Sequence, residues 1–228
     1  MRFRPFLLMS ALLAFTSASC TQASDAAAPG QGGGRSTAGP APKNLDGLAV
    51  ATFAGGCFWA QEEVFEEVKG VRAAVSGYCG GHVKNPTYEQ VAGRQTGHAE
   101  AVDVYYDPKV VAYATLLDIF LRASHNPTQL NRQGPDVGDE YRSAIFYRTP
   151  DEKTAAQAAI KRVDAAKTYA DPVVTQVTAL TEFFPAEGYH QGYYRLHPNQ
   201  PYIASVSRAK VEHFQKEFPQ FVKTGTEK

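Results

Sequence analysis

The feature that most constrains the fold is the order in which strand-like and helix-like segments follow one another from residue 48 onward. Apolar or alternating runs predict strands, and apolar residues at helical spacing predict amphipathic helices. We expect strands at residues 48–54, 71–78, 99–107, 141–147 and 173–178, and helices at residues 57–70, 113–124, 149–167 and 206–218. The two kinds of element intermix without the regular βα alternation of a doubly wound sheet, which predicts an α+β sandwich.

The helix expected at residues 149–167 has the clearest start signal. Thr149 is suited to cap it, Pro150 suits the first helical position, and Glu152 stands where it completes a capping box. These three residues predict where the helix begins.

The first twenty residues predict an export signal. Arg2 and Arg4 precede the apolar run FLLMSALLAF, which is too short to span a bilayer comfortably. Cys20 is a candidate lipid-attachment cysteine, although Ser17 stands where the lipoprotein pattern has Leu, and ordinary cleavage nearby is the alternative. Both alternatives predict an exported protein, either in the periplasm or lipid-anchored to the bacterial cell envelope.

Composition separates a tether from a folded domain. Residues 21–46 are rich in Ala, Gly and Pro and predict a flexible tether, whereas residues 47–222 predict one catalytic domain. The 23 basic and 23 acidic side chains balance, so the overall charge favours neither nucleic acid nor anionic lipid. The three cysteines lack zinc-knuckle spacing, so we expect no structural metal. We also expect the protein to be a monomer.

The stretch GGCFWA at residues 55–60 places Cys57 between a predicted strand and a predicted helix. A helix N-terminus offers unpaired N–H groups and a partial positive charge, and both lower the pKa of a thiol. The pattern therefore predicts a nucleophile, with an inert buried cysteine as the alternative. Glu100 lies in an apolar strand, where burial would raise the pKa of its carboxyl group toward that of a proton donor, with a solvent-facing carboxylate as the alternative.

Five segments, in this order and spacing, resemble the A-type peptide methionine sulfoxide reductases. They are GGCFW, SGYCGG, NPTYEQVAGRQTGHAEAV, HNPTQLNRQGPDVGDEYRSAIFY and FFPAEGYHQGYY, and the similarity runs from about residue 51 to residue 219. The resemblance implies a mixed sheet with a ferredoxin-like core and the reduction of methionine-S-sulfoxide, free or within proteins, to methionine. It also implies a cysteine sulfenic acid intermediate, no bound cofactor, and a thioredoxin-like or small-thiol reductant.

The resemblance assigns a role to each matched residue. Cys57 is the implied nucleophile and Glu100 the implied acid that protonates the sulfoxide oxygen. Five residues are implied to bind the substrate: Tyr88 and Tyr141 hold that oxygen, Asp136 supports the site, and Phe58 and Trp59 receive the S-methyl group.

The way the oxidised nucleophile is reduced stays open at this point. Cys79 in GYCGG is favoured as a resolving cysteine, because the glycines after it allow movement. Direct reduction of Cys57 by an external thiol is the alternative, and Cys79 then only packs. Ala60 stands where some similar enzymes have a second cysteine, and no cysteine follows Cys79.

Two other classes of protein compete with the reductase. A Cys–His hydrolase would need His98, His125 or His190 within hydrogen-bond reach of Cys57. A tethered module that binds peptides through its many Tyr and Phe side chains is the second. Glu187 and His190 have the spacing of a metal pair, but no third ligand stands nearby in the sequence.

Overall fold

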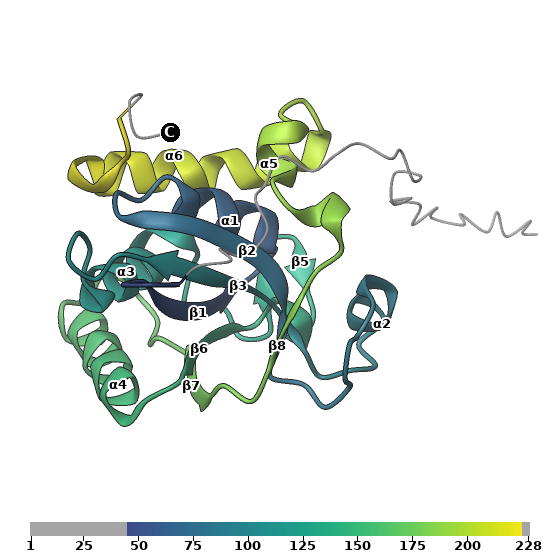
Figure 1. The fold of residues 1–228 in the computed structure, drawn as a ribbon, viewed down its shortest axis with the longest axis horizontal. Helices are drawn as coiled ribbons and strands as arrows, with labels where there is room; N and C mark the ends of the chain where they lie inside the picture. Colours follow the sequence, from purple (N-terminus) through teal and green to yellow (C-terminus); the bar gives the residue numbers. More distant parts are fainter. Residues whose placement is uncertain (1–44, 225–228) are drawn as a thin grey trace, which may run out of the picture. The chain divides into compact units, whose positions relative to one another are not determined.

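A six-stranded mixed sheet forms the centre of the computed structural model, with the strand order β7-β6-β1-β3-β2-β8 (Figure 1). The structure describes residues 45–224. The predicted export signal, most of the predicted tether and Cys20 therefore lie outside the described residues. The strands are β1 (Ala49–Gly55), β2 (Val71–Cys79), β3 (Ala99–Tyr106), β6 (Ser143–Tyr147), β7 (Gln176–Ala179) and β8 (Phe183–Pro185).

Four of these strands have the topology of a ferredoxin-like core. Strands β1 and β2 both pair antiparallel with β3, which lies between them, and α1 (Phe58–Glu66) connects β1 to β2. In the same way, β3 and β6 both pair antiparallel with β1. Strand β7 adds a parallel pairing to β6, so the sheet is mixed. The predicted α+β sandwich with a ferredoxin-like core is confirmed.

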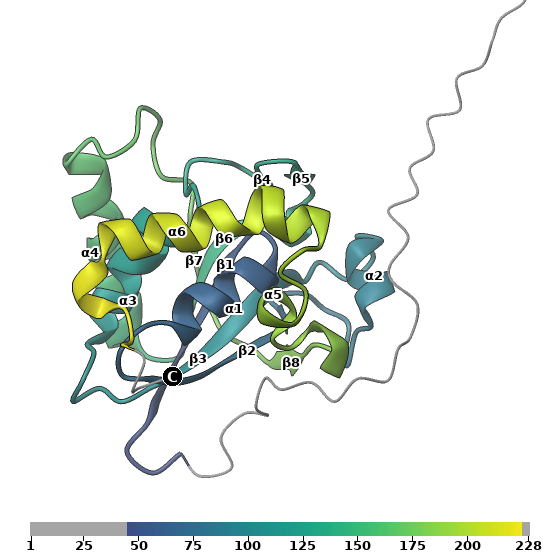
Figure 2. The ribbon, with the colours of Figure 1, turned by 90° about the horizontal axis from the view of Figure 1, so that it is seen from above.

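Helices cover one face of the sheet. These are α1, α3 (Tyr113–Ile119), α4 (Pro150–Ala165) and α6 (Arg208–Glu217), whose buried residues share one large core cluster with side chains of β1, β2 and β3. Helix α6 runs beside α1 over this face (Figures 1 and 2). A π-helical segment, Phe120–Ser124, continues α3 into the core.

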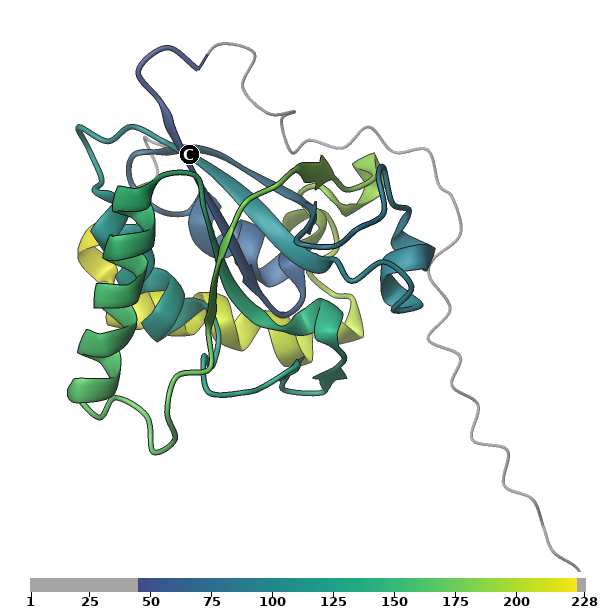
Figure 3. The same ribbon diagram turned by 90° about the horizontal axis from the view of Figure 1, so that it is seen from below.

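The opposite face of the sheet carries a second, smaller cluster of buried side chains, mostly alanines. The segment that leads through β7 to β8 crosses this face (Figure 3), and Leu180 and Phe183 pack against the cluster. Successive residues of a strand point to opposite faces. Accordingly, Phe53 belongs to the large cluster and its neighbour Ala54 to the small one.

Short elements fill the connections. They are α2 (Tyr88–Ala92), the hairpin of β4 (Arg132–Gln133) with β5 (Asp136–Val137), α5 (Tyr193–Leu196), a second π-helical segment (Ile203–Ser207) and three 3₁₀ turns (Asp139–Tyr141, Gly188–His190 and Pro219–Phe221). The elements expected from the sequence include neither α2 nor this hairpin. Among the described residues, the structure contains no helix of sufficient length and apolarity to cross a membrane.

The predicted start of α4 is confirmed in part. The Thr149 hydroxyl accepts a hydrogen bond from the Glu152 N–H at 3.2 Å, and Pro150 is the first helical residue. The Glu152 carboxylate, however, accepts from the N–H of Arg148 at 2.6 Å, one residue before the predicted partner.

Candidate active site

Cys57 occupies the N-cap position of α1, directly after a tight turn from β1. Gly56 makes this turn with φ of +88°, a backbone conformation that residues with a side chain rarely adopt. A Cβ atom at Gly56 would also lie 2.6 Å from Cβ and Cγ of Gln133, so the turn leaves no room for one. The thiol is buried, with 6% of the residue exposed.

The ionisation of Cys57 differs from the sequence-based expectation. Burial raises the pKa of the Cys57 thiol well above its ordinary value, and the nearby Glu100 carboxyl raises it further. Lys210 and the backbone N–H of Trp59 act in the opposite direction. On balance the pKa of Cys57 is raised, because the cost of desolvating a thiolate exceeds the influences that lower it.

Glu100 lies on β3 and reaches the turn that carries Cys57. Its Oε2 accepts a hydrogen bond of 3.0 Å from the backbone N–H of Phe58, the residue after the thiol. The side chain is buried, and burial raises the pKa of its carboxyl group to about 8, a shift that the hydrogen bond from Phe58 reduces. The predicted buried carboxyl with a raised pKa is confirmed, so Glu100 is mostly protonated at neutral pH.

Tyr88 and Tyr141 approach the thiol and the acid from two different short helical segments. Tyr88 is the first residue of α2, and Tyr141 ends a 3₁₀ turn before β6. Burial raises the pKa of both phenols, and Glu100 and Cys57 raise both further. Tyr88 also raises the pKa of Tyr141. The structure therefore brings together the two hydroxyls that the sequence singled out, and both are protonated donors.

Asp136 borders the same site from β5. Its Oδ2 accepts a hydrogen bond from the hydroxyl of Tyr202, and this bond and Lys210 both oppose the burial that raises the pKa of Asp136. Burial raises the pKa of Tyr202, and Cys57 raises it further, so this phenol also lies close to the thiol. Sequence patterns missed Tyr202 because the segment before α6 carries only packing signals.

An aromatic cluster forms around the two residues that follow the thiol. Phe58 is buried with its ring 5.8 Å from the ring of Tyr78. The Trp59 ring stacks on Tyr193 at 3.9 Å between centroids, and its Nε1–H donates to Nδ1 of His190 at 3.1 Å. The predicted pair of rings is therefore present, and His190 and Tyr193 fix the orientation of Trp59.

The residues of the site differ in exposure. Cys57 and Glu100 are buried, whereas Trp59, Tyr88, Asp136 and Tyr141 around them are each partly exposed.

Cys79 does not share this site. It is the last residue of β2 and belongs to the small cluster on the far face of the sheet, whereas Cys57 belongs to the large cluster. Tyr78, its neighbour in the strand, pairs with Glu100 in register and points to the face of the active site. A disulfide requires two Cα atoms within about 7 Å and converging side chains. Cys57 and Cys79 thus lie in different clusters, which does not favour a direct disulfide, and the role of Cys79 as a resolving cysteine stays a prediction.

The three histidines proposed for a hydrolase have other partners. His98 forms hydrogen bonds with the backbone of Gly81 and Val83. His125 forms hydrogen bonds with the Phe120 carbonyl and the Ser143 hydroxyl. Burial lowers the pKa of His125 to about 3 and that of His190 to about 4, so both rings are neutral. Among the described residues, no histidine forms a hydrogen bond with Cys57, and the geometry gives a Cys–His hydrolase no base.

Glu187 and His190 do not form a metal pair. The two carboxylate oxygens of Glu187 accept hydrogen bonds of 2.9 Å from the Tyr88 N–H and the Tyr78 hydroxyl. Nδ1 of His190 already accepts from Trp59. Within the part of the chain that the structure describes, no group of three potential ligands meets at one point.

Comparison with known proteins identifies the family. The family model of peptide methionine sulfoxide reductase matches residues 49–222. Peptide methionine sulfoxide reductase MsrA 1 of Rhodopirellula baltica is 47% identical over 181 residues, which cover 79% of this chain and 93% of that protein. The MsrA of Methanosarcina acetivorans is 54% identical over 149 residues, which cover 65% of this chain and 79% of that protein.

Solved structures show the same fold. Methionine sulfoxide reductase A of Corynebacterium diphtheriae superposes with a TM-score of 0.60 at 30% identity, covering 71% of this chain and 87% of that chain. Reduced Mxr1 from Saccharomyces cerevisiae superposes with a TM-score of 0.64 at 28% identity, covering 69% and 90% of the two chains. This chain belongs to the peptide methionine sulfoxide reductase family. It is an oxidoreductase that reduces methionine sulfoxide at the expense of thiols, which confirms the predicted function.

Proposed function

We propose that Cys57 is the nucleophile of this reduction and that Glu100 is its acid. The Cys57 sulfur attacks the sulfoxide sulfur, while Glu100 transfers its proton to the sulfoxide oxygen. The S–O bond of the substrate then breaks, and the oxygen, with its proton, ends on the Cys57 sulfur. The methionine sulfur gains two electrons and the cysteine sulfur loses two, so the products are methionine and a sulfenic acid at position 57.

The proton balance of this step needs no outside acid. In the resting site the thiol of Cys57 and the carboxyl of Glu100 are both mostly protonated near neutral pH, because burial raises the pKa of each. Glu100 gives its proton to the oxygen, and the thiol proton replaces it on Glu100. The net proton that leaves the thiol becomes the O–H of the sulfenic acid.

The surrounding side chains select and orient the substrate. The hydroxyls of Tyr88 and Tyr141 donate to the sulfoxide oxygen, and Asp136 supports the site through Tyr202. The rings of Phe58 and Trp59 receive the S-methyl group, which makes no hydrogen bonds. Because oxygen, methyl and side chain project from sulfur at fixed angles, donors on one side and rings on the other accept one epimer, which we propose is the S form.

The hydrogen bond from Phe58 to Glu100 is the observation that carries this proposal. This hydrogen bond holds the uncharged carboxyl group of Glu100 next to Phe58, the residue that follows Cys57. The test is turnover of methionine-S-sulfoxide and of methionine-R-sulfoxide with dithiothreitol. We expect turnover of the S epimer by the native protein and none by Cys57→Ser; turnover that survives this substitution would overturn the proposal.

We propose that an external thiol regenerates Cys57 directly. One thiol displaces water from the sulfenic acid to form a mixed disulfide, and a second thiol then releases Cys57 and leaves as a disulfide with the first. A thioredoxin-like protein or a small thiol supplies both. The position of Cys79 across the sheet supports this route over an internal disulfide.

We also propose that the protein is exported, either to the periplasm or to the cell envelope through a lipid anchor at Cys20. There it acts as a monomer on free and protein-bound methionine sulfoxide. The basic and apolar residues of positions 1–20 support export. Labelling with radioactive palmitate, compared between the native protein and Cys20→Ala, tests the anchor. Label that depends on Cys20 supports it, and an unlabelled native protein excludes it.

A further inference from the structure

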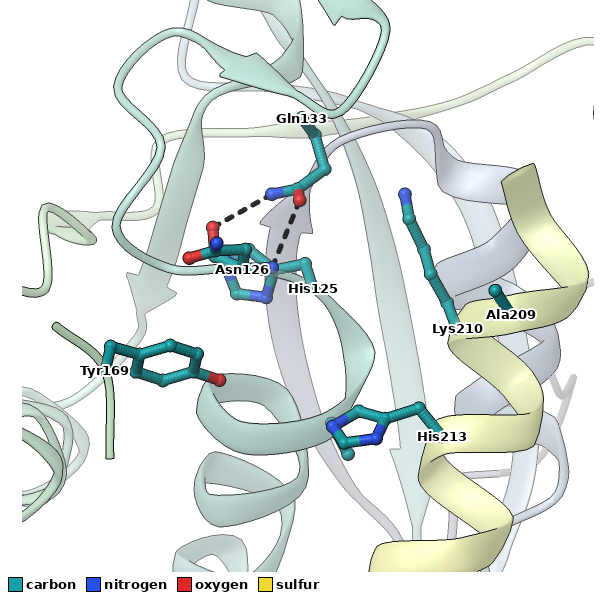
Figure 4. Close-up of a pocket in the computed structure, with 8 residues that line it drawn as sticks. His125, Asn126, Gln133, Tyr169, Ala209, Lys210 and His213 are labelled. Carbon is teal, nitrogen blue, oxygen red and sulfur yellow. Dashed lines mark hydrogen bonds between the residues drawn. The ribbon is translucent and has the colours of Figure 1, made fainter. Parts of the chain in front are cut away.

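Lys210 places a buried ammonium group near the catalytic turn. The residue lies on α6, and its side chain extends away from His213 toward the turn between β1 and α1 (Figure 4). Lys210 is one of the residues that line a pocket of about 270 Å³. Among the described residues, Nζ of Lys210 has no hydrogen-bond partner, although this atom is buried. A buried ammonium without an anionic partner is costly, so its environment requires explanation.

The position of this ammonium relative to Cys57 supplies an explanation. A Cβ atom at Gly56, the residue before Cys57, would lie 3.5 Å from Nζ of Lys210. Burial lowers the pKa of Lys210, and Cys57, Asp136 and Glu100, in decreasing order, raise it. Cys57 thus exerts the largest opposing effect on the lysine.

The two carboxyl groups nearby are engaged elsewhere. Asp136 accepts the hydrogen bond of Tyr202, and Glu100 accepts that of the Phe58 N–H. Glu100 is also mostly uncharged at neutral pH, since burial raises the pKa of this carboxyl to about 8. Neither carboxyl group forms an ion pair with Lys210.

We infer that Lys210 is a positioning residue for Cys57: its ammonium is the counter-ion that stabilises negative charge on the sulfur as the thiol loses its proton and attacks. This inference rests on the proposed role of Cys57 as nucleophile. It explains how a thiol buried for substrate selectivity still reacts, because the charge that burial disfavours develops beside a fixed cation.

Other ionisable groups also face this pair. Around the thiol and the lysine they are Glu100 on β3, Asp136 on β5, Tyr88 on α2, Tyr141 before β6, Tyr193 on α5, Tyr202 before α6 and His125 after α3. The phenols and the acids do not supply positive charge. Burial keeps His125 neutral, with a pKa of about 3. Among these described groups, Lys210 is the cation.

The test measures the reactivity of Cys57 without any sulfoxide. The full-length protein is alkylated with iodoacetamide at a series of pH values, and modification of the peptide that contains Cys57 is followed by mass spectrometry. We expect Lys210→Met to slow alkylation about tenfold at each pH below the titration midpoint of the thiol, which corresponds to one pKa unit. Lys210→Arg should restore most of the native rate because it keeps the charge.

A matched control separates this effect from a general loss of charge or stability. Lys216 lies on the same helix and is exposed, so Lys216→Met should alkylate Cys57 at the native rate. Should Lys210→Met fail to fold by circular dichroism, Lys210→Gln and Lys210→Arg provide the comparison. An unchanged pH profile in the neutral variant, or an equal loss in the arginine variant, would overturn the inference.

The outcome is independent of the reductase proposal. If Cys57 is not the nucleophile, Cys57→Ser keeps its turnover, whatever the alkylation profiles show. If Cys57 is the nucleophile and Lys210 has no effect on it, turnover is lost in Cys57→Ser while alkylation is unchanged in Lys210→Met.

Discussion

The backbone N–H of Phe58 donates a hydrogen bond of 3.0 Å to Oε2 of Glu100, which ties the acid on β3 to the first turn of α1. The donor belongs to the residue directly after Cys57, so the thiol and the carboxyl group cannot move independently. One oxygen of Glu100 accepts this bond, and the other remains to carry the proton. The sheet and the helix together therefore hold an uncharged acid beside the nucleophile.

Replacing this acid should reduce the chemical step while leaving the fold intact. Glu100→Gln keeps an oxygen that accepts the Phe58 bond but has no proton to transfer. We expect the rate of methionine formation in a single turnover to fall by about 100- to 10,000-fold, the usual contribution of general acid catalysis. A decrease of less than about fivefold would remove Glu100 from the mechanism.

The pH dependence follows from the raised pKa of Glu100. Because the protonated form is the active acid and the pKa is about 8, the single-turnover rate should fall as pH rises through about 8. Glu100→Gln lacks this titration, so its residual rate should not show the decrease. Single turnovers without reductant are the suitable measurement, because the reductant itself titrates in this range.

The same carboxyl group should affect stability in the same direction. Its pKa in the folded state lies above the ordinary value of 4.5, so its contribution is complete below that value and is lost as pH rises through about 8. We expect the free energy of unfolding of the native protein to fall relative to that of Glu100→Gln across this interval. Urea titrations of both proteins between pH 5 and 9 measure the difference; parallel curves would contradict it.

The two cysteines of the described domain should behave differently after oxidation. Without reductant, one equivalent of methionine sulfoxide should consume one free thiol per chain, because Cys79 lies across the sheet from Cys57. Cys79→Ser should retain turnover with dithiothreitol, whereas Cys57→Ser should have none. Loss of two thiols per chain, with a Cys57–Cys79 peptide found by mass spectrometry, would restore Cys79 as a resolving cysteine.

Trp59 offers a test of the substrate pocket. Trp59→Phe retains an aromatic ring that stacks on Tyr193 but loses the Nε1–H that donates to His190. A hydrogen bond of this kind contributes about 1 kcal/mol, so we expect KM for methionine sulfoxide to rise roughly fivefold as the ring loses its fixed orientation. Turnover at saturating substrate should change less than KM. An unchanged KM would exclude Trp59 from the pocket.

Much of the fold follows from local patterns, because amphipathic spacing and strand alternation reflect which side chains are buried. The sequence also contains the complete capping box of α2, in which the Thr87 hydroxyl accepts from the Gln90 N–H and the Gln90 side chain accepts from the Thr87 N–H. A five-residue helix has too few turns for apolar periodicity to appear, so no helix is expected there from the sequence pattern.

The active site depends on strand order, burial and long-range contacts, which local sequence patterns do not predict. Strand alternation alone places Tyr78 and Cys79 on opposite faces, but which of these faces carries Cys57 depends on strand order. The pKa of Cys57 depends on the depth of burial, which a helix N-terminus does not determine. Tyr202 and Lys210 reach the site from segments more than 140 residues after Cys57, and no sequence motif predicts such a contact.

Gly56 provides a final prediction, about the turn that presents the thiol. In Gly56→Ala the new Cβ would meet Gln133 at 2.6 Å, and the backbone would keep a φ of +88°. Gln133 cannot move aside freely, because its amide group donates to the carbonyl of Asn126 and accepts from its N–H. We therefore expect the free energy of unfolding to fall by about 2–4 kcal/mol, as typical for combined overpacking and backbone strain.

Gly47→Ala is the matched control for this prediction. Gly47 has a similar φ of +77°, but a Cβ atom there would have no neighbour within 4 Å. In this variant the free energy of unfolding should fall only by the strain of a left-handed conformation, about 1–2 kcal/mol. Urea denaturation of both variants measures the difference, and alkylation of Cys57 should change only in Gly56→Ala. Equal losses of stability would mean that the contact with Gln133 relaxes, and that the turn tolerates a side chain beside the thiol.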